Sequence, residues 1–177
     1  MMEFQLGSIS SGTLRNQDLI PAMLNTLHTL VDDDIEGRVF DTITSNTRYH
    51  DGIGTNCLRL VRYTQNSNGD YGYPGECSDA EHEYWQSDGA QDDYDTLAEA
   101  LNDCCPAYVV FGAIEGDGAD FGFWPDIDRI NEDIANAEYR NGDDILLLEE
   151  MVLVTVNDHG NVTVRDIWSH DILWSCV

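Results

Sequence analysis

Apolar side chains recur at three- and four-residue spacing near the start of the chain, which predicts a helix from about Leu14 to Val31. The apolar face of this helix would consist of Leu19, Ile20, Met23, Leu24, Leu27, Leu30 and Val31. Pro21 indicates that the first turn is bent or that the regular helix begins there. Apolar positions from Ile35 to Ile43 predict a second short helix, which the acidic residues 32–34 would cap.

The middle of the chain changes pattern three times. Leucines and a valine alternate with arginines from Cys57 to Tyr63, which predicts a strand. The segment Asn66–Gln91 is rich in Asn, Gly, Ser, Asp and Tyr and predicts a long loop, with a helical turn near Ala80–Trp85. Tyr94–Cys104 predicts a helix with Leu97, Ala98, Leu101 and Cys104 on one face, and Pro106 ends it.

The C-terminal part predicts a sheet with one more helix. Ala107–Ile114 is a dense apolar strand, followed by a turn at residues 116–118 that leads to Phe121, Phe123 and Trp124. Asp126–Tyr139 predicts a helix that directs Ile127, Ile130, Ile134 and Ala137 inward.

The clearest pattern is a hairpin at the end of the chain. Met151–Val156 and Val162–Trp168 flank the turn residues Asn157–Gly160, and His170–Cys176 supplies a third strand. Asn, Asp and Gly suit a tight turn, so His159 is interpreted as a turn residue and not as a catalytic one.

Together these elements predict an α+β fold, with an antiparallel sheet that includes the C-terminal hairpin and packs with two to four helices. The length of 177 residues and a hydrophobic content of 42% fit a single acidic domain spanning residues 1–177, with a loop-rich acidic segment at about 66–95. The aromatic content argues against a disordered acidic tail.

Charge is the most unusual property of the chain. Residues 76–150 hold 22 acidic side chains and only two basic ones, Arg129 and Arg140, which leaves a local net charge of −20 out of −26. The chain contains no lysine. Because a compact domain repels itself when it carries so much charge of one sign, the excess indicates a basic partner. Duplex DNA carries about one charge per 1.7 Å of axis, so twenty charges match roughly 34 Å of duplex.

No motif predicts catalysis, a metal or a cofactor. P-loop, HExxH and GxSxG patterns are absent, and the five cysteines, Cys57, Cys77, Cys104, Cys105 and Cys176, include no CxxC pair. The acids around Asp126 and Asp128 lack the central glycine of an EF-hand loop. We therefore predict no catalytic residue, no metal site and no cofactor, and the cysteines are interpreted as reduced thiols.

The acidic segment 76–150 and the lack of lysine resemble the DNA-mimic proteins that phages and mobile elements use against restriction enzymes and CRISPR effectors. This resemblance implies an inhibitor that occupies the basic nucleic-acid groove of a host defence protein and does not bind nucleic acid itself. Two other segments, 116–124 and 156–164, resemble parts of uncharacterised phage and bacterial proteins, and this likeness implies no function.

The predicted partner-binding residues all lie in the acidic segment. They are Asp79, Glu81, Glu83, Asp88, Asp92, Asp93, Asp95, Glu99, Asp117, Asp120, Asp126, Asp128, Glu132 and Asp133. Nearby aromatics, namely Tyr84, Trp85, Tyr94 and Tyr139, are candidate interface anchors.

The chain has no basic-then-apolar leader and no apolar run of about 20 residues, which predicts no membrane contact and a cytoplasmic location, that of the host cell if a phage encodes the protein. Monomer and homodimer both remain open.

Three alternatives to mimicry remain. A carboxylate- or cation-dependent hydrolase would use one or two of the same acids. A salt-adapted acidic binding domain would explain why Asp outnumbers Glu by 23 to 11, although the acids would then be spread evenly along the chain. A binding module for a basic protein would need no likeness to DNA.

Overall fold

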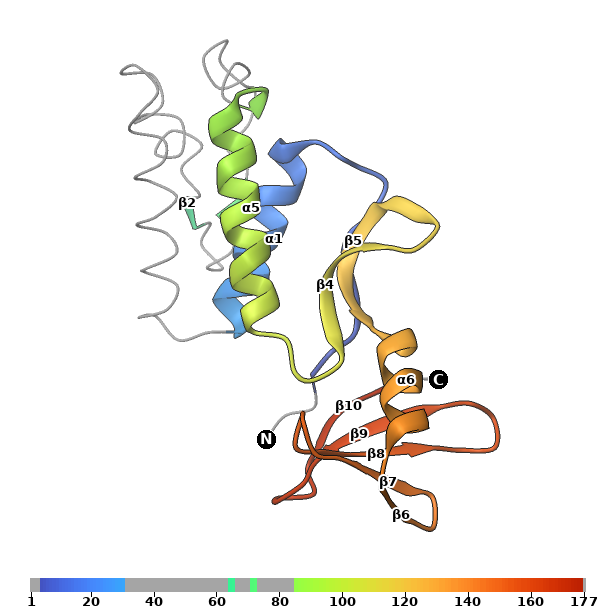
Figure 1. The fold of residues 1–177 in the computed structure, drawn as a ribbon. Coiled ribbons are helices and arrows are strands. Elements are labelled where there is room, and N and C mark those ends of the chain that lie inside the picture. Colours follow the sequence, from blue (N-terminus) through green and yellow to red (C-terminus); the bar gives the residue numbers. More distant parts are fainter. Residues whose placement is uncertain (1–3, 31–63, 66–70, 73–84, 177) are drawn as a thin grey trace. The chain divides into compact units, whose positions relative to one another are not determined.

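The computed structural model describes residues 4–30, 64–65, 71–72 and 85–176. The predicted helix at 35–43, the predicted strand at 57–63 and most of the predicted turn at 80–85 lie outside these residues. In the described part, three helices combine with antiparallel sheets, which confirms the α+β class (Figure 1).

The chain divides into two compact units. The helix unit comprises residues 9–104 and 113–121, and the sheet unit comprises residues 1–8, 105–112 and 122–177. Each unit therefore draws on segments that are far apart in the sequence.

The helix unit contains α1 (Asn16–Leu30) packed against α5 (Asp88–Asp103). The centre of the predicted apolar face of α1 is confirmed, because five of its side chains are buried: Leu19, Ile20, Met23, Leu24 and Leu27. Leu30, which was predicted on the same face, is 39% exposed at the end of the helix. Helix α1 also contacts β3 (Tyr71–Gly72), which pairs antiparallel with β2 (Thr64–Gln65).

Helix α5 begins six residues before the predicted start at Tyr94. The hydroxyl of Ser87 accepts a hydrogen bond from the backbone N–H of Ala90 at 3.4 Å and caps the helix. The predicted loop was therefore too long. A serine cap followed by an acidic first turn signals the start of a helix, and the prediction did not take this signal into account.

A three-stranded sheet has the order β1 (Gly7–Ser10), β5 (Asp117–Pro125), β4 (Val109–Ile114). The turn between β4 and β5 lies at residues 115–116, slightly earlier than predicted, and Gly116 supplies the positive φ of 89° that it requires. In the sheet unit, the ring of Phe123 lies 5.0 Å from that of Phe4 and 5.3 Å from that of Phe111. These aromatic contacts fix the end of β5 that enters the sheet unit.

Gly122 lies where the backbones of β5 and β1 approach closely. A Cβ atom at this position would collide with the carbonyl group of Gly7 and lie 2.8 Å from the Cα atom of Ser8. We expect Gly122→Ala to lower the free energy of unfolding by about 1–3 kcal/mol, because two backbone segments must separate. Urea unfolding measures the loss. Gly112→Ala in neighbouring β4 is the matched control, since nothing lies within 4 Å of its added Cβ; equal stabilities of the two variants would contradict the prediction.

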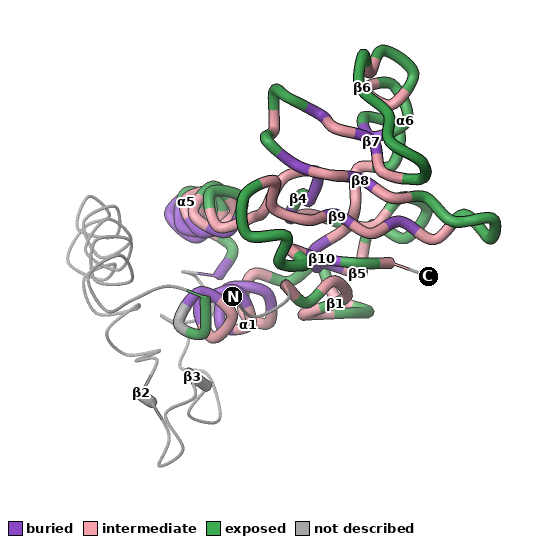
Figure 2. The backbone as a smooth tube through the Cα atoms, turned by 90° about the horizontal axis from the view of Figure 1, so that it is seen from below, coloured by how far each residue is buried: buried purple, intermediate pink, exposed green. Residues whose placement is uncertain are grey.

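The second sheet has five antiparallel strands and lies in the sheet unit. Its order is β10 (Ile172–Cys176), β9 (Val162–Asp166), β8 (Val152–Val156), β7 (Asp144–Leu147), β6 (Tyr139–Asn141). The predicted hairpin is confirmed by the pairing of Val154 with Val164, both fully buried, and the predicted third strand by the pairing of β10 with β9. Buried residues alternate with more exposed ones along β8 and β9 (Figure 2).

The turn of the β8–β9 hairpin is held by a side chain. The Asn157 Oδ1 atom accepts hydrogen bonds from the backbone N–H groups of His159 at 2.9 Å and Asn161 at 3.0 Å, and Gly160 adopts a φ of 84°. The interpretation of these residues as turn formers is confirmed.

Helix α6 (Ile127–Asn136) ends three residues before the predicted end. Tyr139 lies in β6 instead, because Gly142 with a φ of 65° turns the chain into a hairpin with β7. The predicted inward face of α6 was too wide. Ile130 is buried, whereas Ile127 is 38% exposed.

Candidate partner-binding surface

Five carboxylates form a row along the exposed face of α5. The acidic stripe, as we name it, consists of Asp88, Asp92, Asp95, Glu99 and Asp103, which follow one another at intervals of four, three, four and four residues. At about 100° per residue, they fall within an arc of about 80°. All five residues are exposed, and the buried and exposed residues of α5 lie on opposite sides of the helix (Figure 2).

The opposite face of α5 explains why the stripe points to solvent. Ala90, Leu97 and Leu101 are buried, so packing of this apolar face fixes the rotation of the helix. Tyr94 lies beside this face, half-buried, and its ring makes an edge-on contact with Phe121 at 6.1 Å. Burial, followed by the negative charge of Asp95, raises the pKa of Tyr94.

No arginine or lysine lies in α5 to offset the stripe. Its ends are fifteen residues apart, or about 22 Å at 1.5 Å per residue, so that one carboxylate follows another at about 5–6 Å. Neighbours at this distance are closer than the screening length of about 10 Å in 0.1 M salt, and like charges four residues apart destabilise a helix. One strand of a duplex carries a phosphate about every 3.4 Å of axis, so the stripe is a sparser single row.

Asp93 differs from the other predicted contact residues of α5. Its side chain is fully buried, with an exposed fraction of 0%, on the apolar side of the helix. It is therefore not a surface carboxylate, and its place in the predicted set is corrected. Asp103 replaces it, since this residue was omitted from the predicted set although it continues the stripe.

Two predicted acids of the helix unit lie on β5. Asp117 is exposed, and its Oδ1 atom accepts a hydrogen bond from the backbone N–H of Ala119 at 3.1 Å. Asp120 is half-buried. Neither residue belongs to the stripe.

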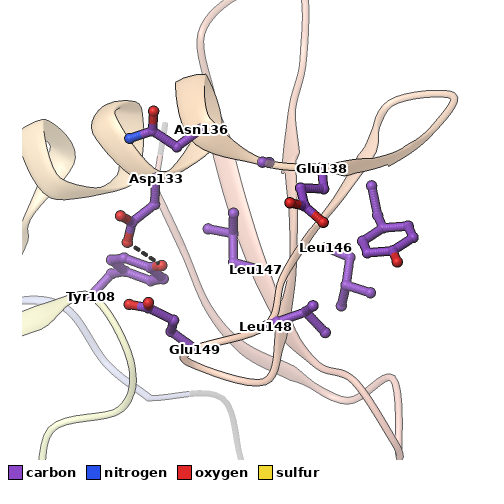
Figure 3. A pocket seen from close by; sticks show the side chains of 10 residues that line it. Tyr108, Asp133, Asn136, Glu138, Leu146, Leu147, Leu148 and Glu149 are labelled. Atoms are coloured by element: carbon purple, nitrogen blue, oxygen red, sulfur yellow. Dashed lines mark hydrogen bonds between the residues drawn. The ribbon is translucent and has the colours of Figure 1, made fainter.

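The remaining described acids of the predicted set lie on or beside α6 in the sheet unit. Asp128 and Glu132 are exposed. Asp126 caps α6, because its Oδ1 atom accepts a hydrogen bond from the backbone N–H of Arg129 at 3.0 Å. Asp133 accepts a hydrogen bond from the Tyr108 hydroxyl at 2.7 Å (Figure 3). The carboxylates of Asp126 and Asp133 thus stabilise the fold as well as adding charge.

Asp79, Glu81 and Glu83 of the predicted set lie outside the described residues, as does Tyr84. Two of the predicted aromatic anchors differ in exposure. Trp85 is buried, which corrects its interpretation as an exposed anchor, whereas Tyr139 is 55% exposed. An exposed tyrosine is suited to a contact surface, because its ring supplies a large contact area and loses little conformational entropy when a partner binds.

The Tyr108–Asp133 pair lies in an electrically charged setting. The Arg129 guanidinium lies 5.2 Å from the centre of the Tyr108 ring and forms an ion pair with Glu150. Burial of the phenol, then the hydrogen bond to Asp133, and then the negative charges of Asp133 and Glu150 raise the pKa of Tyr108, while Arg129 opposes them. The Tyr108 hydroxyl is therefore a protonated hydrogen-bond donor at neutral pH.

We expect Tyr108→Phe to lower the free energy of unfolding by about 1–2 kcal/mol at pH 7, because a hydrogen bond to a carboxylate is lost. Since folding raises the pKa of Tyr108, its contribution is complete below the ordinary tyrosine pKa of about 10 and is lost as the pH rises further. The deficit of the variant should therefore shrink at about pH 11. Urea unfolding at both pH values measures this, with the exposed Tyr139→Phe as the control. A deficit that is unchanged at high pH would contradict the prediction.

Among the residues that the structure describes, no group of three or more His, Cys, Asp or Glu side chains is placed to hold a metal ion. No described helix is long and apolar enough to cross a membrane. Cys104, Cys105 and Cys176 are half-buried, and no disulfide bond joins them in the part of the chain that the structure describes. Comparison with family models, curated proteins and solved structures found no match to this chain.

Proposed function

We propose that this protein is an inhibitor that binds the basic nucleic-acid groove of a host defence protein, a restriction-modification enzyme or a CRISPR effector, and blocks its binding to DNA. The observation that carries the proposal is the acidic stripe on α5. Five carboxylates point to solvent along about 22 Å of one helix, with no basic residue between them.

The stripe has a cost for the helix that bears it. Repulsion between carboxylates four residues apart works against folding, and Asp103 lies at the helix end where negative charge is least favourable. A charged surface that lowers the stability of its own helix is typical of a binding function, because a basic partner removes the repulsion between the carboxylates when it binds.

A groove lined with arginine and lysine is the partner of matching charge. It would attract the stripe over long range, with an association rate that falls as the salt concentration rises. The same charge repels phosphates, so we infer no direct binding of nucleic acid. If the target is a host defence enzyme, the protein acts in the host cytoplasm.

The test begins with capture from a bacterial lysate at about 50 mM NaCl and elution at about 500 mM, where surface charges are screened. The eluted proteins are identified, and each nucleic-acid-binding protein among them is purified. Its binding to labelled duplex DNA is then titrated with the inhibitor. We expect DNA to be displaced at one inhibitor per binding groove. A captured protein that binds DNA with full affinity when saturated with the inhibitor would overturn the proposal.

The same preparation separates mimicry from adaptation to high salt. A salt-adapted domain loses its folded state at low ionic strength, because its carboxylates are no longer screened. We expect a cooperative thermal transition at about 50 mM NaCl. Unfolding at this salt concentration would instead favour salt adaptation.

A further inference from the structure

The sheet unit contains a pocket of about 260 Å³ between the end of α6, strands β6 and β7, and the turn that follows β7. Tyr108 and Asp133 line one side of the pocket, and Leu147 and Leu148 line it beside them (Figure 3). Glu138 comes from the connection between α6 and β6, and Glu149 from the turn after β7. Small-molecule sites usually measure about 300–1,000 Å³, so this pocket is suited to a single side chain.

The charges around the pocket are not balanced. Asp133, Glu138 and Glu149 contribute three carboxylates to its lining. Arg129 lies 5.2 Å from the centre of the Tyr108 ring, but its charge is offset by the ion pair with Glu150. Arg140 donates a hydrogen bond to the carbonyl oxygen of Ile134 at 2.6 Å. Within the described residues, neither Glu138 nor Glu149 forms an ion pair. A cation that entered the pocket would therefore meet an excess of negative charge.

The pocket is also apolar at its centre and rim. Leu147 is buried, whereas Leu148 is 52% exposed and Tyr139 is 55% exposed. A purely inorganic cation would leave these apolar groups without a contact. An aliphatic chain that ends in a cation would satisfy both, because its methylene groups cover the leucines while its head reaches the carboxylates.

We infer that this pocket binds an arginine side chain of the basic partner. The inference rests on the proposed function for the source of the arginine. A guanidinium group suits the site better than an ammonium group, because its planar fork of five N–H donors can bond to more than one carboxylate at once. Arginine buried in a pocket with an aromatic and apolar rim is also a common point of high binding energy in interfaces.

The pocket is tested directly by NMR titration of the full-length, ¹⁵N-labelled protein with Nα-acetyl-arginine methylamide. We expect saturable chemical-shift changes at the amides of residues 133–149, with a dissociation constant in the millimolar range, about what a single charged side chain supplies. The citrulline analogue has nearly the same shape without the charge, and we expect it to bind at least about tenfold more weakly. Equal binding of citrulline, or shifts located elsewhere, would overturn the inference.

Two variants locate the interaction. Glu138→Gln/Glu149→Gln removes two exposed carboxylates with little change in shape, and we expect arginine binding to weaken by about tenfold or more. Glu115→Gln/Asp158→Asn changes the total charge equally at exposed positions outside the pocket and should leave the affinity unchanged. Equal weakening by both pairs would show a diffuse charge effect and would overturn the site.

The source of the arginine and the proposed function are tested separately. Glu138→Gln/Glu149→Gln should also weaken binding to the captured partner, and full retention there would refute the partner's arginine as the occupant. The inhibitor could also fail to displace DNA from every captured protein while the pocket still binds the arginine analogue. In that case the proposed function is wrong, but the affinity of the pocket for the guanidinium group is still supported.

Discussion

Removal of four carboxylates from the acidic stripe should weaken binding of the basic partner by roughly 100-fold at low salt. The variant is Asp92→Asn/Asp95→Asn/Glu99→Gln/Asp103→Asn, in which every changed residue is exposed. Solvent-exposed charge pairs contribute about 0.2–1 kcal/mol each, so that four of them amount to roughly 1–4 kcal/mol, a range that includes the free-energy change of a 100-fold loss. Asp88 is kept, because its carboxylate in the first turn stabilises α5.

Salt dependence gives the second part of this prediction. If the stripe stands in for a single row of phosphates, each lost charge removes about 0.7 from the slope of log affinity against log salt. The four substitutions should reduce the slope by about three. Calorimetric titrations of the purified partner at several salt concentrations between about 50 and 200 mM measure both quantities.

The matched control removes four other exposed acids, namely Glu115, Asp143, Asp158 and Asp171. It has the same net charge as the stripe variant, but its substitutions lie outside α5. We expect it to retain at least a third of the wild-type affinity. Full inhibition by the stripe variant, or equal losses in both variants, would sink the assignment of the stripe as the contact surface. Misfolding does not explain a loss, since relief of repulsion should make the stripe variant at least as stable as the wild type.

Trp174→Ala should lower the free energy of unfolding by about 3–5 kcal/mol, the largest effect on stability that we expect of a single substitution. The Trp174 side chain is fully buried, with an exposed fraction of 0%, and its Nε1–H donates a hydrogen bond to the carbonyl oxygen of Ala107 at 2.8 Å. The substitution removes a large apolar side chain from an edge strand and leaves that carbonyl group without its donor. Urea unfolding followed by circular dichroism measures the loss.

Two further tryptophan substitutions separate the contribution of the ring from that of the N–H group and provide a control. Trp174→Phe keeps most of the ring but not the N–H group, and we expect a loss of about 1–3 kcal/mol. Trp168→Ala is the control, because this side chain is 76% exposed on the turn before β10, and its loss should be within about 0.5 kcal/mol. If Trp168→Ala lowered the free energy of unfolding as much as Trp174→Ala does, the placement of Trp174 in the core and Trp168 on the surface would be contradicted.

Several elements follow from local pattern. The apolar stripe of α1 and the alternation of β8 and β9 depend on residues that are close in sequence, and the Asn157–Gly160 turn has residues of the type that its geometry requires. The β6–β7 hairpin was missed, although Gly142-Asp143, the two residues between the paired Asn141 and Asp144, are of a type that signals a tight turn. Its strands of three and four residues are too short to show a period, and the helical pattern before them obscured the boundary.

The stripe was missed for a similar reason. Its residues were in the predicted set, except for Asp103, but the helix was expected to begin only at Tyr94. Once α5 is known to start at Asp88, the spacing of its acids places them on one face. A loop would have implied no such alignment.

The sequence by itself determined the sign, the density and the position along the chain of the acidic charge, because these depend on composition alone. The tertiary structure decided which acids are available to a partner. Packing of Leu97 and Leu101 turns Asp92 and Asp95 outward and Asp93 inward. The pocket beside Tyr108 brings together Asp133 from α6, Glu138 from the connection between α6 and β6, and Glu149 from the turn after β7. Burial and convergence depend on contacts between distant segments, which local spacing does not encode.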